Sequence, residues 1–191
     1  MDSPFMHFLA GGLAERGWRV VRFEFPYMAR SRATGKRHGP DRQPVLLESW
    51  REQVAAVAAE GPLFIGGKSM GGRMASVLLD ELAHSSAVRA CLCFGYPFHP
   101  PGKPESLRTE HLLAMRSACL IVQGERDSFG RRSEVENYGL PPTIQLAWIP
   151  DGDHSFKPTK RSGRDEASNL ALAVAAADHF MALFCPDRSV G

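Results

Sequence analysis

The chain has 191 residues, a length at which one domain buries roughly 70% of its unfolded surface in a single core. Its 23 lysines and arginines nearly balance 21 aspartates and glutamates, and the formal net charge of +2 gives no reason to expect nucleic acid or an anionic membrane as a partner. The start lacks the basic and apolar regions of a signal peptide, and no apolar stretch approaches the ~20 residues of a membrane span. We expect one soluble, cytoplasmic domain over residues 1–191, with its core at about 1–184 and small molecules as partners.

The four cysteines form no C-x-x-C pair of the kind that binds a metal. Cys91, Cys93 and Cys119 lie in apolar runs that are typical of buried strands, and Cys185 lies near the end of the chain. We interpret them as reduced thiols of a cytosolic protein. Neither a metal nor an organic cofactor is expected.

The first third of the chain predicts a helix, a strand and a loop. Apolar residues recur at helical spacing over 5–16, behind Ser3 as a cap and Pro4 at the first helical position. The segment 18–25 is rich in valine and phenylalanine and ends at a proline, which predicts a strand. Over 27–44 basic residues mix with glycine and proline, which predicts a long exposed loop. Its charges are interpreted as solvated, with an anion-attracting rim above a ligand site as the alternative.

The rest of the chain alternates between strand and helix patterns. We predict strands at 63–65, 88–96, 119–122 and 144–149, helices at 48–59, 73–84, 105–115 and 165–184, and a helical turn at 133–138. No internal repeat or linker interrupts this order. It predicts an α/β fold with a doubly wound, mostly parallel sheet. The loop 98–104 is too short for a cap domain, so we expect an open site.

The segment 67–71 fits G-x-S-x-G and lies between an apolar run and an amphipathic stretch. A strand that turns sharply into a helix with serine at the apex is the nucleophile elbow of α/β-hydrolases. We interpret Gly67 and Gly71 as relieving a collision between strand and helix. One alternative is a phosphate-binding loop, which lacks its upstream glycine here. Another is an ordinary tight turn between strand and helix.

A serine nucleophile needs a base, and that base needs a carboxylate to orient it. In this fold the acid and the histidine follow the serine in that order, each on a loop after a later strand. Asp127 and His154 occupy these positions, so we predict Ser69 as nucleophile, His154 as general base and then acid, and Asp127 as its orienting carboxylate.

Each partner of the serine has a rival in the sequence. Glu125 could be the acid, but it lies nearer the strand end, and Asp151 and Asp153 are interpreted as turn formers. His99 could be the base, although it follows the wrong strand and is flanked by prolines.

The oxyanion hole is predicted to use the backbone N–H of Met70, directly after the nucleophile. The second donor normally comes from a glycine-rich loop after an earlier strand, yet no such strand precedes the first predicted helix. We therefore expect that one or more N-terminal strands are missing and that activity is reduced.

Lys68, Tyr27 and His99 are the candidate substrate-binding residues. Lys68 could pair with a substrate carboxylate, but a structural role, such as an ion pair with Glu24 or another acid, is favoured. The short loop 98–104 favours a small or flexible ester as the substrate.

Five stretches resemble one branch of the α/β-hydrolase superfamily: MDSPFM at 1–6, RFEFPYM at 22–28, GGKSMGGR at 66–73, GYPFHPPGKP at 95–104 and QGERD at 123–127. The branch contains a testis-expressed hydrolase-like protein, a subunit of the NSL chromatin complex and many small bacterial proteins. The resemblance spans about 1–184. It implies the hydrolase fold, with nucleophile Ser69, acid Asp127 and base His154. It also implies an upstream His-Gly-Ala-Gly-type loop, which this sequence lacks. Dienelactone hydrolases are similar in size but usually use cysteine as nucleophile.

Together these features predict a serine hydrolase that acts on a small carboxylic ester or thioester through an acyl-enzyme. The alternative is a non-catalytic, hydrolase-like module for protein interaction. A sheet edge exposed by a missing strand would favour a homodimer.

Overall fold

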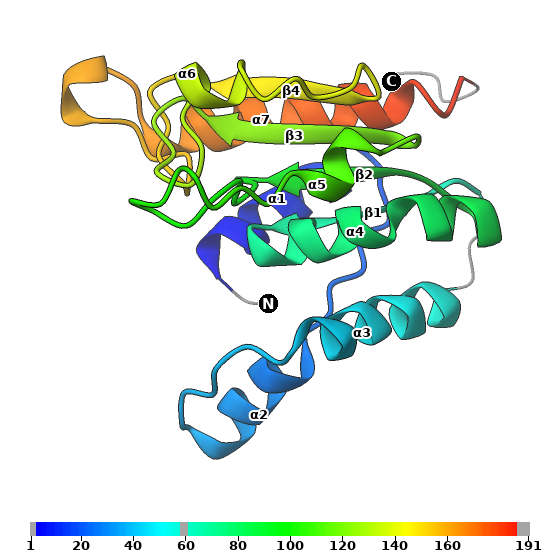
Figure 1. Cartoon of the computed structure of the whole chain (residues 1–191). Helices are drawn as coiled ribbons and strands as arrows, with labels where there is room; N and C mark the ends of the chain where they lie inside the picture. Colours follow the sequence, from blue (N-terminus) through cyan, green and yellow to red (C-terminus); the bar gives the residue numbers. More distant parts are fainter. Residues whose placement is uncertain (1–2, 58–60, 187–191) are drawn as a thin grey trace.

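The computed structural model describes residues 3–57 and 61–186. At its centre lies one parallel sheet with its strands in chain order (Figure 1). The four strands are β1 (Leu63–Lys68), β2 (Val88–Phe94), β3 (Ala118–Gly124) and β4 (Ile144–Ile149). The prediction of an α/β fold with a parallel sheet is confirmed, and the described residues form no cap domain over the sheet.

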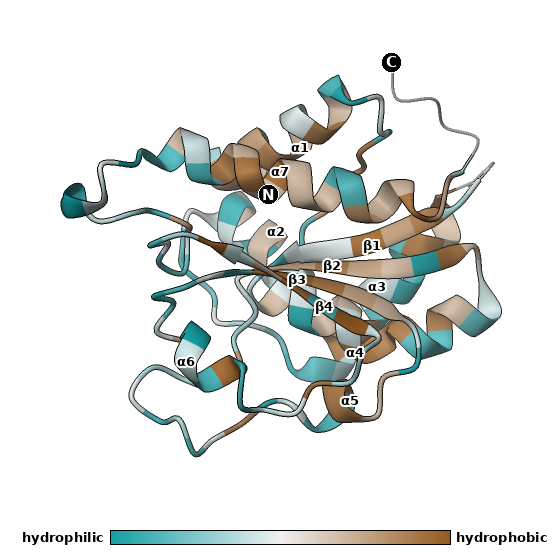
Figure 2. Cartoon of the chain, turned by 90° about the horizontal axis from the view of Figure 1, so that it is seen from above, coloured by the Kyte–Doolittle hydropathy of each residue, from teal (hydrophilic) through white to brown (hydrophobic). Residues whose placement is uncertain are grey.

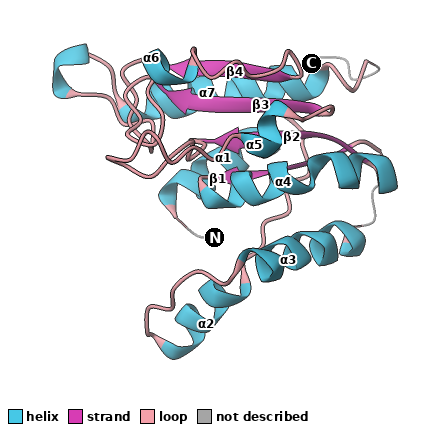
Figure 3. Cartoon of the chain, viewed as in Figure 1, coloured by secondary structure: helices cyan, strands magenta, loops and turns pink. Residues whose placement is uncertain are grey.

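Helices cover both faces of this sheet (Figures 2 and 3). The α-helices are α1 (Pro4–Glu15), α2 (Pro26–Thr34), α3 (Gln43–Ala56), α4 (Met70–Ser85), α5 (Glu110–Leu113), α6 (Arg132–Val135) and α7 (Glu166–Ala182), with a 3-10 turn η1 at Lys160–Ser162. One apolar core joins α3, α4 and α5 to one face, and a second joins α1 and α7 to the other. A parallel strand between two such layers must be apolar on both sides, which explains the almost unbroken burial of β2.

One helix start follows the predicted signals, and another lies earlier than predicted. Ser3 caps α1 by accepting a hydrogen bond from the Met6 N–H at 3.3 Å, and Pro4 opens the helix. The predicted helix at 48–59 begins earlier, at Gln43, because Pro44 lies in its first turn. Residues 58 and 59 of that prediction lie outside the described residues.

The predicted loop at 27–44 is partly wrong, because it contains α2. The start of this helix depends on Asp41, whose carboxylate accepts from the Tyr27 N–H at 2.9 Å and pairs with Arg30 at 2.5 Å. Arg32 pairs with Glu24 at 2.8 Å, so these arginines belong to ion pairs. Because Asp41 is fourteen residues from Tyr27, no local sequence pattern indicates the start of this helix.

The prediction of a strand at Trp18–Phe25 is also wrong. This segment is not among the strands of the described sheet. A strand exists only where a neighbouring strand accepts its main-chain hydrogen bonds, and the segment is separated from β1 by a cavity that both line. The predicted helix at 105–115 is likewise shorter and covers Glu110–Leu113.

No helix among the described residues is long and apolar enough to cross a membrane.

Candidate active site

Ser69 lies at the sharp turn between β1 and α4. Its backbone has φ 52° and ψ −118°, a strained conformation for a residue with a side chain. The serine N–H donates to the Phe94 carbonyl at 2.9 Å, which ties the turn to the end of β2. The turn therefore holds the hydroxyl at the carboxyl edge of the sheet.

The glycines that permit this turn are only partly those predicted. A Cβ on Gly67 would lie 3.0 Å from backbone atoms of the first turn of α4, as expected. A Cβ on Gly71 would meet nothing within 4 Å, whereas one on Gly72 would lie 2.5 Å from the Gly67 carbonyl oxygen and 3.1 Å from Cys93 Cα. The close approach of helix and strand thus occurs at Gly67 and Gly72.

The three predicted catalytic residues come together, although they are far apart in the sequence. His154 Nε2 lies 3.0 Å from Ser69 Oγ, and His154 Nδ1 lies 2.8 Å from Asp127 Oδ2. Because an ionised carboxylate only accepts hydrogen bonds, Nδ1 carries the proton in this pair and Nε2 is free to accept the serine proton. The three side chains thus have the hydrogen-bonded order Ser–His–Asp that catalytic triads have.

Asp127 is fully buried and held by two further donors. Gln123 Nε2 donates to its Oδ2 at 3.0 Å, and the Phe129 N–H donates to its Oδ1 at 2.9 Å. Gln123 Oε1 also accepts from the Tyr96 N–H at 2.7 Å, which joins the acid loop to the loop after β2. Sequence reasoning missed Gln123. Its signal was a lone amide at the end of the apolar run 119–122.

Hydrogen bonds on one side and ring packing on the other hold the loop that carries His154 in place. Asn169 on α7 is fully buried, and its Nδ2 donates to the Pro150 and Phe156 carbonyls at 3.0 and 2.8 Å. On the other side, the Phe129 ring packs against the His154 ring with centroids 4.3 Å apart. Asn169 was also missed, although a single asparagine in an alanine- and leucine-rich helix could have drawn attention.

The rival acids have structural roles. Glu125 accepts from Arg132 at 2.9 Å and from the Asp151 N–H at 3.0 Å. Asp151 accepts from the Thr159 N–H and hydroxyl, at 2.5 and 2.7 Å. Asp153 accepts from the N–H groups of Ser155 and Lys157 at 2.8 and 3.0 Å. Asp151 and Asp153 thus form turns, as the sequence indicated.

Met70 is the first residue of α4, directly after the nucleophile. The first N–H groups of a helix have no partner within it, and the helix dipole places partial positive charge there. The Met70 N–H is therefore available to stabilise an oxyanion formed on a carbonyl that Ser69 attacks.

Lys68 has a different partner from the one proposed. The ion pair with Glu24 is wrong, because Glu24 pairs with Arg32. Lys68 Nζ instead donates to the His154 carbonyl and lies 4.9 and 5.7 Å from the ring centroids of Phe5 and Phe156. Burial lowers the pKa of Lys68 to about 8, against the attraction of nearby carboxylates. This contact of Lys68 therefore supports the backbone at His154.

Ser69, Lys68, Met70 and Tyr27 line one cavity of about 870 Å³ that extends along β1. Burial, with the charge of Asp41, raises the pKa of the Tyr27 hydroxyl. The roles of Lys68 and Tyr27 in substrate binding stay predictions, and both residues are in position for them.

His99 does not line that cavity among its described residues. It is buried, with Nδ1 2.9 Å from the Pro100 carbonyl and Nε2 3.6 Å from Glu134. The backbone N–H of His99 donates to the Phe129 carbonyl at 3.1 Å, so His99 supports the loop that carries Asp127. A contact between His99 and substrate has no support from this geometry, nor is His99 the base.

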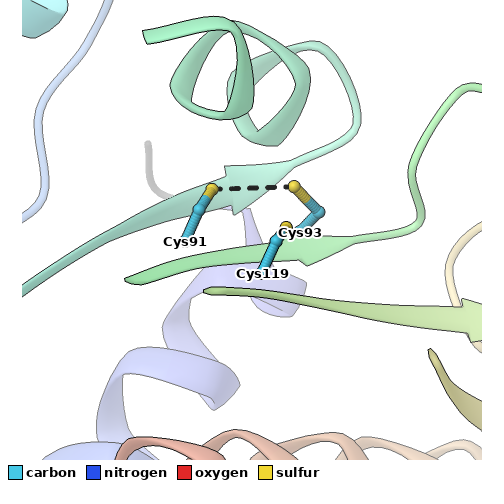
Figure 4. A group of neighbouring side chains, drawn as sticks. All are labelled: Cys91, Cys93 and Cys119. Carbon is cyan, nitrogen blue, oxygen red and sulfur yellow. Dashed lines mark hydrogen bonds between the residues drawn. The ribbon is translucent and has the colours of Figure 1, made fainter. Parts of the chain in front are cut away.

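Three cysteines form a buried cluster between β2, β3 and α4 (Figure 4). The sulfur atoms of Cys91, Cys93 and Cys119 lie within 4.8 Å of one another, because Cys91 is in register with Cys119 on the next strand. The pKa values of Cys91 and Cys93 are raised, for Cys91 chiefly by burial and for Cys93 chiefly by its hydrogen bond to Cys119. The same group of hydrogen bonds lowers the pKa of Cys119 to about 5. All three side chains are fully buried in an apolar core, where cysteine packs as a small hydrophobic residue.

Solved structures with the same fold come from several bacteria. A serine hydrolase homologue from Coxiella burnetii is 19% identical with a TM-score of 0.65, over 92% of this chain and 77% of that one. A serine hydrolase without a lid from Xanthomonas campestris is 21% identical with a TM-score of 0.60, over 93% and 75%. The esterase domain of a Rhodothermus marinus protein is 16% identical with a TM-score of 0.62, over 92% and 78%.

A family model described as the alpha/beta hydrolase domain matches residues 1–182. This match covers the elbow, the acid loop and the histidine loop, and it confirms the superfamily to which the sequence motifs pointed. The narrower branch stays a prediction. By sequence match, sheet topology and the order of Ser69, Asp127 and His154, the chain belongs to the α/β-hydrolase domain family.

Proposed function

We propose that this protein is a serine hydrolase that cleaves a small carboxylic ester or thioester through an acyl-enzyme. The observation that carries the proposal is the relay from Ser69 Oγ through His154 to Asp127, with distances of 3.0 and 2.8 Å. A free serine hydroxyl is a poor nucleophile at neutral pH, and a base in this position removes its proton as it attacks.

The reaction proceeds in two halves. Ser69 Oγ attacks the carbonyl carbon while His154 Nε2 takes the serine proton, and the charge that develops on the carbonyl oxygen faces the Met70 N–H. The bond to the leaving group then breaks, and His154 donates its proton to the departing alcohol or thiol. Water enters, loses a proton to His154 and attacks the acyl carbon, which releases the acid and restores Ser69. Asp127 stays ionised throughout.

The size of the substrate follows from the surroundings of Ser69. Within residues 3–57 and 61–186 no cap domain covers the sheet, and the cavity beside the serine is lined mainly by apolar side chains such as Met28 and Phe25. An ester with a small or flexible acyl group can therefore reach the nucleophile. Met70 is the oxyanion donor that we assign among the described residues.

The first experiment uses a fluorophosphonate probe, which reports the nucleophile without requiring the right substrate. Intact-protein mass should show one adduct in the wild type and none in Ser69→Ala. Ser85→Ala is a matched control, because Ser85 lies at the last turn of α4, where its hydroxyl donates to the Glu81 carbonyl at 2.9 Å.

Turnover of p-nitrophenyl acetate and of a small thioester by the same three proteins then tests the reaction. Full activity in Ser69→Ala would overturn the proposal. No adduct and no turnover in the wild type would favour the non-catalytic interaction module.

A further inference from the structure

A group of polar side chains lies on the side of α4 that faces α5. Its members come from α4, from the loop after β2 and from α5, and they are Arg73, Ser76, Tyr96, Arg108 and His111. We call them the arginine cluster. None of them lines the cavity beside Ser69, so the cluster is separate from the space that a substrate ester would occupy.

The arginine cluster is built from elements that flank β2 and β3. Figure 1 shows α5 on the β3 side of α4 and α3 on the opposite side. His111 of α5 approaches Ser76 of α4, with Nε2 2.9 Å from Oγ, whereas α3 joins α4 through Arg51 and Glu81 at 2.7 Å. Strands β2 and β3 lie inside the sheet, between β1 and β4. The cluster is therefore not formed at the edge of the sheet beside β1.

The neutral members of the cluster are occupied with backbone groups. Ser76 Oγ donates to the Arg73 carbonyl and the Tyr96 hydroxyl donates to the Arg108 carbonyl, both at 2.8 Å. Ser76 Oγ has one proton, so it accepts from His111 Nε2. Burial, and then the charge of Arg73, lowers the pKa of His111 to about 4. Burial also raises the pKa of the Tyr96 hydroxyl, so neither ring is charged at neutral pH.

The two arginines of the cluster have no carboxylate partner. Among the described residues neither Arg73 nor Arg108 forms an ion pair, and Arg73 Nε is buried without a hydrogen-bond partner. Burial, followed by the positive charge of Arg73, lowers the pKa of Arg108. Two like charges held together in a partly desolvated place are unfavourable unless an anion accompanies them.

The chemistry of these donors favours an oxyanion. A guanidinium presents its N–H groups in a planar fork that fits two oxygens of a carboxylate or phosphate group, whereas a chloride ion offers only one acceptor atom. The backbone of Arg108 is held in place, because its N–H donates to the Phe98 carbonyl at 2.7 Å. Arg73 and Arg108 are both half-buried, so a small ion can reach them from solvent.

We propose that Arg73 and Arg108 bind one oxyanion, the carboxylate or phosphate group of a small molecule. The bound group offsets the two guanidinium charges and supplies an acceptor for Arg73 Nε. It joins α4, which begins directly after Ser69, to the loop that follows β2.

Isothermal titration calorimetry of the full chain tests the binding, with inorganic phosphate and acetate as probes and sodium chloride to keep the ionic strength constant. At least one probe should bind with saturation. Tighter binding of phosphate assigns the site to a phosphate group, and tighter binding of acetate assigns it to a carboxylate. No ester is present, so the result does not depend on the proposed hydrolase activity.

Acetamide has the shape of acetate without its charge, and it should not bind. Binding of acetamide as tight as that of either anion would overturn the proposal. Absence of saturable binding of both anions at tens of millimolar would overturn it as well.

Three variants locate the binding. Arg73→Gln and Arg108→Gln each remove one cation and its charge-assisted hydrogen bonds, so affinity for the anion should fall at least tenfold in either variant. Arg89→Gln is the matched control, because Arg89 is exposed near the start of β2 and its loss changes the net charge equally. Its affinity should stay within twofold of the wild type. An equal loss in the control would show an effect of net charge alone and would contradict a site at the two arginines.

Urea unfolding with and without the anion separates a ligand site from a structural arginine. With chloride as the only anion, Arg108→Gln relieves repulsion between like charges, so its unfolding midpoint should equal or exceed that of the wild type. The saturating anion should raise the midpoint of the wild type but not that of the variant. A lower midpoint of the variant in chloride would show that Arg108 is paired within the protein, and the proposal would fail.

Nitrogen-15 NMR of the arginine side chains provides the readout at single atoms. The Nε–H resonance of Arg73 should shift as the anion is added. That of Arg51, which donates to Glu81 at 2.7 Å, should stay in place and serves as the internal control. A titration that leaves the Arg73 resonance unmoved would place the anion elsewhere and overturn the proposal.

Discussion

Several hydrogen bonds hold the carboxylate of Asp127 in one orientation. The carboxylate is fully buried, and its charge is met by the His154 ring, the Gln123 amide and the Phe129 N–H. A buried charge is tolerated when its lone pairs are occupied in this way. The same contacts prevent rotation of the carboxylate, so the tautomer of His154 is set before substrate arrives.

Replacement of Asp127 by asparagine should lower kcat for p-nitrophenyl acetate by about 10³–10⁴-fold while the structure persists. An amide N–H facing His154 favours the tautomer with its proton on Nε2, which cannot accept the proton of Ser69. Steady-state kinetics provides the measurement, with circular dichroism as the control for folding. A loss below tenfold would show that Asp127 does not orient the histidine.

The lowered pKa of Lys68 predicts that the stability of the protein depends on pH. Because burial lowers its pKa to about 8 from 10.5, the native chain has released this proton in the window between the two values, whereas the unfolded chain still holds it. Stability then rises with pH across that window. Lys68→Met removes this contribution.

The measurement is urea unfolding of both proteins at a pH just below 8 and again near 10. The wild type should gain stability relative to Lys68→Met between the two conditions. An unchanged difference would show that the lysine is not desolvated in the folded chain.

At the scale of elements, the site is built where β1 meets α4. The helix begins immediately after the strand and folds back over the sheet, so backbone atoms of the two elements approach more closely than side chains allow. A Cβ on Gly72 would lie 2.5 Å from the Gly67 carbonyl oxygen, whereas a Cβ on Gly71 would meet nothing within 4 Å. Of these two adjacent glycines, only Gly72 is therefore needed for the close approach of helix and strand.

Gly72→Ala should destabilise the protein by about 1–3 kcal/mol, because the helix must move away from β1. It should also lower esterase activity, since Ser69 moves with the turn. Gly71→Ala has open space and should be neutral or stabilising by up to about 1 kcal/mol, as expected for alanine in a helix. Urea unfolding of the pair tests this; equal losses would contradict the close approach at Gly72.

The helix α7, which packs in the second apolar core, also holds the loop that carries His154. Asn169 reaches from this helix to the carbonyls of Pro150 and Phe156, on either side of His154. The position of His154 therefore depends on a helix that contributes none of the three residues Ser69, His154 and Asp127. The packing of α7 on one face of the sheet therefore affects where His154 lies at the carboxyl edge of the sheet.

For the whole molecule, stability rests on two apolar cores separated by one sheet. The core under α3, α4 and α5 contains Leu79, which is fully buried, whereas Leu113 on α5 is 52% exposed. The catalytic residues lie at the edge where both cores end. Loss of packing in either core should thus reach the active site through the strands.

Leu79→Ala should lower the free energy of unfolding by about 2–5 kcal/mol, because it removes buried methyl groups and leaves a cavity. Leu113→Ala should change it by less than about 0.5 kcal/mol, since the side chain is largely solvated. Urea unfolding followed by circular dichroism measures both. Similar losses in the two variants would contradict the assignment of Leu79 to the core.

The sequence by itself determined the strands, the elbow and the order of the catalytic residues. These features have local signatures. Apolar runs mark the four strands of the sheet, glycine and serine spacing marks the turn at Ser69, and parallel strands bring Asp127 and His154 to the same edge because their loops follow strand ends. Chain order and elementary sheet geometry were sufficient to bring three distant side chains together.

Only the tertiary structure decided the residues that hold this site and the elements at its margin. Gln123 and Asn169 act through contacts with other elements, and α2 begins where Asp41 caps it from fourteen residues away. Trp18–Phe25 has the composition of a strand but lines a cavity instead, because a strand requires a partner and none lies within reach among the described residues. Such contacts join distant parts of the chain, so a local pattern can mark Gln123 or Asn169 as unusual in an apolar segment but cannot show which groups they contact.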